Sequence, residues 1–395
     1  MFVYADNAAT TSVSKTALDA MLPYLTENYG NPSSLYSFAQ KVTEDVAQAR
    51  ADVAACINAE PREIYFTSGG SEADNQALRS MAEAGRRAGK LHVISTAFEH
   101  HAVLHTLKKL EAEGFAVTLL PVGADGLVRP EALAAALRDD TCLVSVMYAN
   151  NEIGTVQPVA ELGAICRERG VPFHTDAVQA VGHLPIDVKA QRIDLLSASA
   201  HKFHGPKGVG FLYARRGLRL TSLIEGGAQE RGKRAGTENV PGIAGMAAAL
   251  TEAARNMEAN AAHLIPLRDR LIAGLGEIPH AALNGDALRR LPGNVNFCFE
   301  GIEGESLLLL LDDRGICASS GSACTSGSLD PSHVLLAIGR SHDVAHGSLR
   351  LTPGEDVTAE EIEYMIQNVK EVVAYLRSFS PIWRDLQSGK KPYIL

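Results

Sequence analysis

The sequence contains no long apolar run and no basic tract, and each absence excludes a class of protein. The most apolar stretch, residues 307–311, is far shorter than the roughly 20 residues that a helix needs to span a bilayer. Residues 1–6 have neither the basic segment nor the apolar core of a secretory signal. Lys and Arg number 37 against 46 Asp and Glu, and a net charge of −9 disfavours general binding of nucleic acid or of a membrane surface.

Cysteine is scarce and widely spaced. Six cysteines in 395 residues are too few for a disulfide framework, and none forms a Cys-x-x-Cys pair of the kind that holds structural zinc. His201 and His204 lie three residues apart without a third ligand at a suitable spacing, so we expect no metal site. Because free thiols persist in a reducing compartment, we expect a cytoplasmic protein.

Short apolar runs alternate with longer helical patterns through the first two-thirds of the chain. This alternation predicts an α/β fold with a mainly parallel sheet flanked by helices. The strand-like runs cover residues 63–67, 91–95, 117–121, 142–148, 172–175, 195–198 and 209–213. Helical patterns begin at Ser71 and cover residues 130–138 and 159–169.

The composition changes near Pro241, where an Ala-rich helical stretch begins and continues toward Leu275. Beyond it the sequence predicts a strand at 294–299, a Leu-rich helix at 306–312 and a final helix at 358–378. We therefore predict a large domain over residues 13–260 and a smaller α+β domain. The smaller domain combines residues 1–12 with 261–395 and carries a mobile loop at about 318–330.

Polar clusters follow several of the predicted strands, where ligands bind in open α/β sheets. Residues 67–72 (TSGGSE) could present the N–H groups of a helix N-terminus to an anion, or form an ordinary Ser-capped turn. Residues 150–154 (NNEIG) fit a plain polar turn. Asp176 could hold a cationic ring nitrogen or cap a helix.

Two nucleophilic side chains stand in unusual surroundings. Lys202 closes a hydrophobic strand beside His201; a lysine there could form a Schiff base or belong to a basic surface loop. Cys324 lies in a segment rich in Gly and Ser, residues 319–328, which is typical of a loop and not of a buried thiol. The other five cysteines fall in apolar or helical stretches and are expected to pack as small hydrophobic side chains.

The combined motifs resemble those of the cysteine desulfurases of the NifS/IscS type, which are class-V aminotransferases of PLP fold type I. The matching segments are 6–11 (DNAATT), 30–34 (GNPSS), 66–73 (FTSGGSEA), 99–100 (EH), 150–154 (NNEIG), 176–179 (DAVQ), 199–202 (SAHK), 234–237 (RAGT) and 322–327 (SACTSG). The resemblance implies a seven-stranded, mainly parallel sheet in the large domain. It also implies a homodimer with shared active sites.

The resemblance also implies a role for each matched residue. Lys202 would hold pyridoxal 5'-phosphate (PLP) covalently, Asp176 would contact its ring nitrogen, and His100 would stack on the ring as a candidate proton shuttle. The other implied cofactor contacts are Gly70, Ser71, Asn151, Gln179, Ser199, His201 and, from the partner subunit, Thr237. Cys324 would be the sulfur-accepting nucleophile, and Arg350, with Asn151, would bind the substrate carboxylate.

The implied function is conversion of L-cysteine to L-alanine, with Cys324 carrying the sulfur as a persulfide to an acceptor such as an iron–sulfur scaffold. The alternatives are a selenocysteine lyase or related β-eliminating PLP enzyme, an aminotransferase, which would not need Cys324, and a catalytically silent sulfur-trafficking scaffold. The chain departs from the family pattern at Tyr36, at residues 351–355 (LTPGE) and in its tail, residues 388–395.

Overall fold

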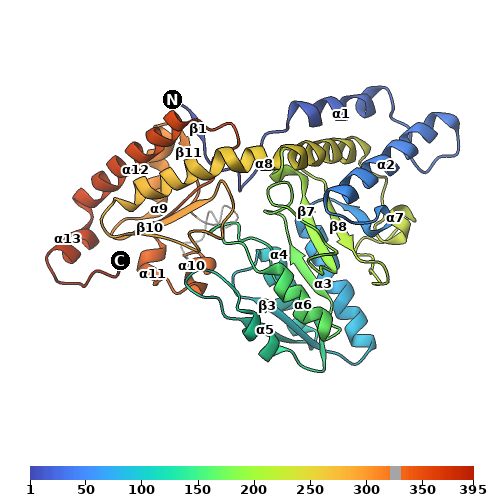
Figure 1. Cartoon of the computed structure of the whole chain (residues 1–395), viewed down its shortest axis with the longest axis horizontal. Helices are drawn as coiled ribbons and strands as arrows, with labels where there is room; N and C mark the ends of the chain where they lie inside the picture. The colour runs from blue at the N-terminus through green and yellow to red at the C-terminus, as the bar shows by residue number, and fades with distance from the viewer. Residues whose placement is uncertain (321–330) are drawn as a thin grey trace.

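The computed structural model describes residues 1–320 and 331–395, so Cys324 and most of the predicted loop at 318–330 lie outside the described residues. The chain forms two lobes joined by the long helix α8 (Val240–Gly276), as Figure 1 shows. The large lobe holds strands β2–β8 and helices α1–α7. The small lobe holds β1, β9–β12 and α9–α13.

The large lobe is built on a seven-stranded sheet with the order β2-β8-β7-β6-β5-β3-β4. Only β8 runs antiparallel to its neighbours, β2 and β7, so the predicted α/β fold with a mainly parallel sheet is confirmed. The strands are β2 (Ile64–Thr67), β3 (His92–Thr96), β4 (Ala116–Leu120), β5 (Thr141–Ser145), β6 (Phe173–Asp176), β7 (Leu195–Ser199) and β8 (Gly210–Ala214).

Helices cover both faces of this sheet. Because neighbouring residues of a strand point to opposite faces, each central strand contributes apolar side chains to both. On β7, Leu195 packs in the cluster under α3 and α4, whereas Leu196 packs in the cluster under α2, α6 and α8. Burial on both faces explains why the central strands read as continuous apolar runs. The helices are α1 (Lys15–Thr26), α2 (Ser37–Cys56), α3 (Gly70–Arg87), α4 (His101–Ala112), α5 (Pro130–Ala136), α6 (Val159–Glu168) and α7 (Gln229–Gly232).

The small lobe packs helices on a three-stranded antiparallel sheet of order β12-β10-β9. A separate parallel pair joins β1 (Val3–Tyr4) at the start of the chain to β11 (Ile316–Cys317). The remaining elements are β9 (Ala281–Leu283), β10 (Val295–Phe299), β12 (Ser348–Leu351), α9 (Gly304–Asp313), α10 (His333–Ala337), α11 (His342–Ala345), α12 (Ala359–Phe379) and α13 (Pro381–Gln387).

Two sequence predictions about these elements are wrong. The strand predicted at 142–148 ends at Ser145, although the N–H groups of Val146 and Tyr148 still donate to the carbonyls of His174 and Asp176, both in β6. The helix predicted to be final is followed by α13. Pro381 cannot continue α12 but suits the first position of a new helix, which Ser380 caps.

No helix among the described residues is long and apolar enough to cross a membrane. The cysteines that the structure describes are free thiols; Cys142, Cys166 and Cys298 are buried, and Cys56 and Cys317 are partly buried.

A buried ion pair ties α2 to the large sheet. The Arg50 guanidinium donates to both carboxylate oxygens of Glu230, at 2.7 and 2.8 Å, and lies over the Phe66 ring at 4.2 Å from its centroid. Glu230 also accepts from the Phe66 N–H at 3.1 Å. Since this carboxylate is nearly fully buried, it depends on these donors to offset its lost hydration.

We therefore expect Glu230→Ala to lower the free energy of unfolding by about 3 kcal/mol, because it leaves a buried guanidinium without its counter-ion. Urea denaturation would measure the loss. The control is Glu363→Ala, which removes the partner of Arg270 in a pair that is about half exposed, and should cost under about 1 kcal/mol. Equal losses for the two variants would contradict the prediction.

Candidate active site

A cavity of about 290 Å³ lies at the carboxyl ends of the parallel strands. Parallel strands end at one edge of the sheet, so polar residues that follow them in the sequence meet there. Ten of the sequence-predicted residues line this cavity: Gly70, Ser71, His100, Asn151, Asp176, Gln179, Ser199, His201, Lys202 and Arg350. The large lobe supplies nine of them, and the small lobe supplies Arg350.

The first turn of α3 forms one end of the cavity. Its N-cap residue is Gly69, which has a φ of +148° and no side chain, so the alternative of a Ser-capped turn is wrong. A Cβ on Gly70 would lie 2.5 Å from Val178 Cγ2 and 3.7 Å from Ser199 Cβ. The first-turn N–H groups of a helix have no partner within the helix, so this end fits an anion such as phosphate.

Lys202 reaches the cavity through a single 3-10 turn that follows β7. Its Nζ donates to the carbonyls of Ala8 and Ala9 at 2.6 and 2.7 Å. Its own carbonyl accepts from His183 Nε2 at 2.8 Å. The amine is therefore held beside the cavity by the N-terminal segment of the chain.

Asp176 ends β6 and is 4% exposed. Burial raises the pKa of its carboxyl, while His100, the Val178 N–H and Lys202 act in the opposite direction. The Val178 N–H donates to Oδ1 at 2.9 Å. A buried carboxyl of this kind gains most from a cationic partner, and a protonated pyridine nitrogen would supply one.

His100 caps α4 and faces Asp176. Its Nδ1 accepts from the Ala102 N–H at 3.1 Å, so the proton of the neutral ring sits on Nε2. Asp74, His100 and Asp176 bring one ligand atom each within 4.8 Å of one another. A metal ion could use that geometry, and the Lys202 amine lines the same cavity.

Arg350 lies on β12, and its side chain reaches the same cavity from the small lobe. Nη2 pairs with Asp6 Oδ1 at 2.8 Å, and Nη1 donates to the Asn151 carbonyl at 3.0 Å. Only 2% of the side chain is exposed. These contacts orient the guanidinium at the cavity wall.

Several lining residues were not predicted from the sequence: Ala8, Ala9, Asp74, His101, Met147, Glu152, Val178 and His333. Asp74 could have been predicted, because it lies one helical turn after Gly70 and therefore on the same face of the helix. His333 gave no signal, because its ring meets His101 at 4.7 Å only through the packing of α10 near α4. Thr237 is exposed and does not line the cavity, and Cys324 lies outside the described residues.

The aminotransferase class-V family matches residues 3–365. The cysteine desulfurase IscS of Methanosarcina thermophila is 55% identical over 380 residues, which cover 96% of this chain and 94% of that protein. The cysteine desulfurase IscS of Clostridium botulinum is 54% identical over 392 residues, 98% of each chain.

Solved structures agree. A NifS-like protein superposes with a TM-score of 0.89 at 38% identity, covering 95% of this chain and 100% of that one. The structure of SspA in complex with cysteine superposes with a TM-score of 0.78 at 36% identity, covering 89% of this chain and 99% of that one. The chain therefore belongs to the class-V aminotransferase family, and within it to the cysteine desulfurases. The resemblance read from the motifs is confirmed.

We expect Gly70→Ala to weaken PLP binding about tenfold, since the added methyl overpacks a wall formed by a stiff β-branched side chain at a cost of about 1–3 kcal/mol. Titration of the apoprotein with PLP, followed by absorbance, measures the affinity. Gly276→Ala is the matched control, because its Cβ would meet nothing within 4 Å. An unchanged affinity of Gly70→Ala for PLP would show that the N-terminus of α3 does not bind the phosphate.

Proposed function

We propose that this cysteine desulfurase converts L-cysteine to L-alanine and passes the sulfur to Cys324, which carries it as a persulfide to an acceptor protein. The observation that carries the proposal is the single cavity that gathers Lys202, Asp176 and His100 from the large lobe with Arg350 from the small one. A similar solved protein holds cysteine, which supports this substrate.

PLP is the cofactor that these residues fit. The α3 N-terminus with Ser71, Ser199 and His201 would hold the phosphate, Lys202 the aldehyde carbon, and Asp176 the ring nitrogen, with Gln179 and Asn151 beside the ring. When bound, PLP supplies an electron sink for charge that develops at the substrate α-carbon. Burial of the His201 ring lowers its pKa to about 4, so it would meet the phosphate as a neutral donor or acceptor.

The chain's own residues divide the remaining work. Lys202 would take the proton from the substrate α-carbon, and Arg350 would hold the carboxylate so that this proton faces the amine. The Cys324 thiolate would attack the substrate sulfur. A sulfur–sulfur bond forms as the substrate carbon–sulfur bond breaks, and the carbon keeps the electron pair and takes up a proton to leave as alanine.

The domain boundaries predicted from the sequence, 13–260 for the large domain and 1–12 with 261–395 for the small one, agree with the packing at the N-terminus and along α8, whereas Val334, Leu335 and Val344 pack in the large-lobe cluster. Val3 and Ala5 pack with Leu264 and Leu271 in the small-lobe cluster, whereas the first half of α8, up to Leu250, packs against the large sheet. We propose that the two domains meet along α8 and at the cavity.

We also propose a cytoplasmic setting and an iron–sulfur scaffold as the acceptor. Free thiols at the cysteines that the structure describes favour a reducing compartment. The net charge of −9 gives no support to a nucleic-acid partner.

Release of alanine and sulfide from L-cysteine, with PLP and a reductant present, tests the assignment of roles. Wild type should yield equal amounts of both products, and Lys202→Ala should yield neither. Cys324→Ala should lose desulfuration but keep the visible absorbance of bound PLP. Full activity in Cys324→Ala would instead favour direct β-elimination, as in a selenocysteine lyase.

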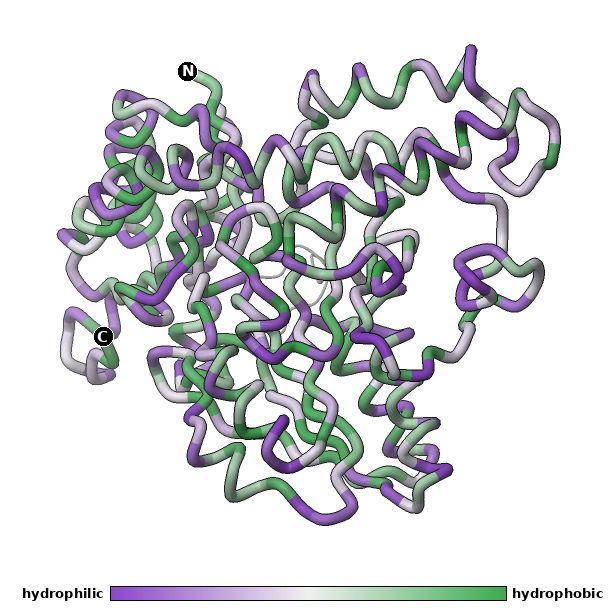
Figure 2. The backbone as a smooth tube through the Cα atoms, turned by 45° about the vertical axis from the view of Figure 1, so that its right-hand side comes forward, coloured by the Kyte–Doolittle hydropathy of each residue, from purple (hydrophilic) through white to green (hydrophobic). Residues whose placement is uncertain are grey.

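The exposed apolar face of α1 supports a homodimer. Leu18, Leu22 and Leu25 are 47%, 50% and 56% exposed, and their spacing places them on one side of the helix. α1 lies at the outer edge of the large lobe, and apolar residues recur along it between polar ones in Figure 2. Thr237 is exposed on the same lobe, so we propose that it reaches the phosphate of the partner subunit.

We expect the double variant Leu22→Glu, Leu25→Glu to be monomeric, because charges would be buried in an apolar interface. Sedimentation velocity measures the change in mass. Leu309→Glu is the control, since Leu309 is 68% exposed on α9 of the small lobe. A dimer that survives the double change would place the interface elsewhere.

A further inference from the structure

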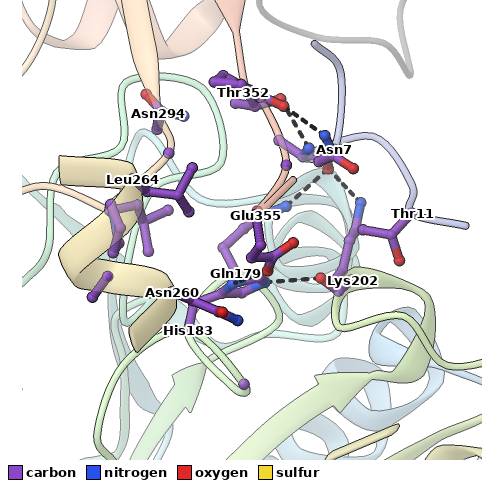
Figure 3. Close-up of a pocket in the computed structure, with 18 of the residues that line it drawn as sticks. Asn7, Thr11, Gln179, His183, Lys202, Asn260, Leu264, Asn294, Thr352 and Glu355 are labelled. Carbon is purple, nitrogen blue, oxygen red and sulfur yellow. Dashed lines mark hydrogen bonds and ion pairs between the residues drawn. The ribbon is translucent and has the colours of Figure 1, made fainter. Parts of the chain in front are cut away.

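The departure from the family pattern at residues 351–355 ends in a carboxylate that joins the two lobes. Glu355 follows β12, which carries Arg350, and its Oε2 lies 2.9 Å from His204 Nε2 in the large lobe. Its Oε1 lies 3.8 Å from His183 Nδ1. Glu355, His183 and Lys202 together line a small cavity of about 60 Å³ between the lobes (Figure 3).

The hydrogen bonds of His204 require a charged ring. Nδ1 lies 3.0 Å from the carbonyl oxygen of Ser12, and Nε2 lies 2.9 Å from the carboxylate of Glu355. Both partners only accept, so both ring nitrogens must carry a proton. Burial alone would raise the pKa of Glu355, but the hydrogen bond from His204 and the nearby His183 lower it to about 2. The contact is therefore an ion pair.

On the large-lobe side this ion pair adjoins the cofactor lysine. His204 lies two residues after Lys202 and has a φ of +63°, a left-handed conformation that costs about 1 kcal/mol or more and persists only where neighbours enforce it. Its N–H donates to Thr11 Oγ1 at 2.9 Å. His183 donates to the Lys202 carbonyl at 2.8 Å. Contacts to His183, Thr11 and Glu355 thus fix this turn.

On the small-lobe side the ion pair adjoins the substrate arginine. Between Arg350 and Glu355, Thr352 donates its N–H to the Ala5 carbonyl at 2.7 Å, and its hydroxyl accepts from the Ala8 N–H at 3.0 Å. The backbone from Arg350 to Glu355 is therefore attached to the same N-terminal segment that holds the Lys202 amine.

We propose that the His204–Glu355 ion pair positions the two halves of the active site, setting the separation between Lys202 and Arg350. This inference rests on the proposed roles of those two residues. Neither member of the pair is a catalytic residue, because each acts through the backbone turn that it anchors. Loss of the pair should loosen the grip on the substrate carboxylate more than it slows chemistry on bound substrate.

The pair gives this positioning a dependence on pH. The charged groups that face His204 are Glu355, Asp356 and Glu252, and His183 faces the other carboxylate oxygen of Glu355. The hydrogen bond to Glu355 outweighs burial and raises the pKa of His204 above its usual 6.5. Because the pKa of His204 is raised on folding, the ion pair contributes its full stability at a pH below the pKa that His204 has in the unfolded chain. This stability is lost as the pH rises through the pKa that His204 has in the folded protein.

The test compares full-length wild type with Glu355→Gln and with His204→Asn, whose side chain tolerates a positive φ. The variant-to-wild-type ratio of KM for L-cysteine cancels titration of the substrate itself. We expect this ratio to be about fivefold at pH 6.5, equivalent to about 1 kcal/mol, and to approach one at pH 9.5, with kcat changed less than twofold. The difference in Tm between the apoproteins should close over the same pH range.

Glu363→Gln is the control, because Glu363 is a small-lobe carboxylate that pairs with Arg270 on the surface. It should leave KM and its pH dependence unchanged. A KM ratio near one at pH 6.5 in both active variants would overturn the positioning role, as would a ratio that stays constant with pH. Failure of wild type to release alanine would overturn the proposed function instead.

Discussion

The active site depends on the N-terminal segment, residues 5–12, which lies between the two lobes and hydrogen-bonds to both. On one side, Ala5 donates to the Cys317 carbonyl and accepts from Thr352, at 3.0 and 2.7 Å. On the other side, Thr11 donates to the His201 carbonyl at 2.9 Å, and Ala8 accepts from Lys202. Displacing this segment would move Lys202 and Arg350 together. Eight residues near the start of the chain thus help to assemble a cavity whose lining residues extend along the chain as far as Arg350.

The surroundings of this cavity are rich in buried carboxyl groups. Asp74, Glu99, Glu152 and Asp176 are buried, and burial raises the pKa of each, that of Glu99 to about 8. The buried ring of His174, between Ser145 and Ser197, has its pKa lowered to about 3 and therefore adds no compensating charge. Because burial disfavours the charged form of each of these acids, a cationic ring nitrogen would favour ionisation of the carboxyl nearest to it. This arrangement favours Asp176 as the group that binds that cation.

The sequence predicted those parts of the molecule that follow from local pattern. Strand ends and the polar residues after them, such as Asp176 and Lys202, could be found because burial on both faces leaves continuous apolar runs with abrupt polar ends. Glu230 shows the limit: a carboxylate in a four-residue helix gives no sign that Arg50, 180 residues earlier, will bury it. His333 and Glu355 were not predicted for the same reason, since only the packing of the lobes brings them to His101 and His204.

The division of the site between two lobes also bears on the proposed role of Arg350 in binding the substrate carboxylate. A buried guanidinium must keep a counter-ion, and Asp6, on the N-terminal segment, supplies one at 2.8 Å. Asp6 and a substrate carboxylate carry the same charge, so both would pair with the guanidinium of Arg350. Its planar group has several N–H donors and could hydrogen-bond to both. Asp6 therefore preserves the orientation of Arg350 at the cavity wall before substrate arrives. In the proposed role of Arg350, Asp6 would also weaken its attraction for a substrate carboxylate, because the two carboxylates share one cation.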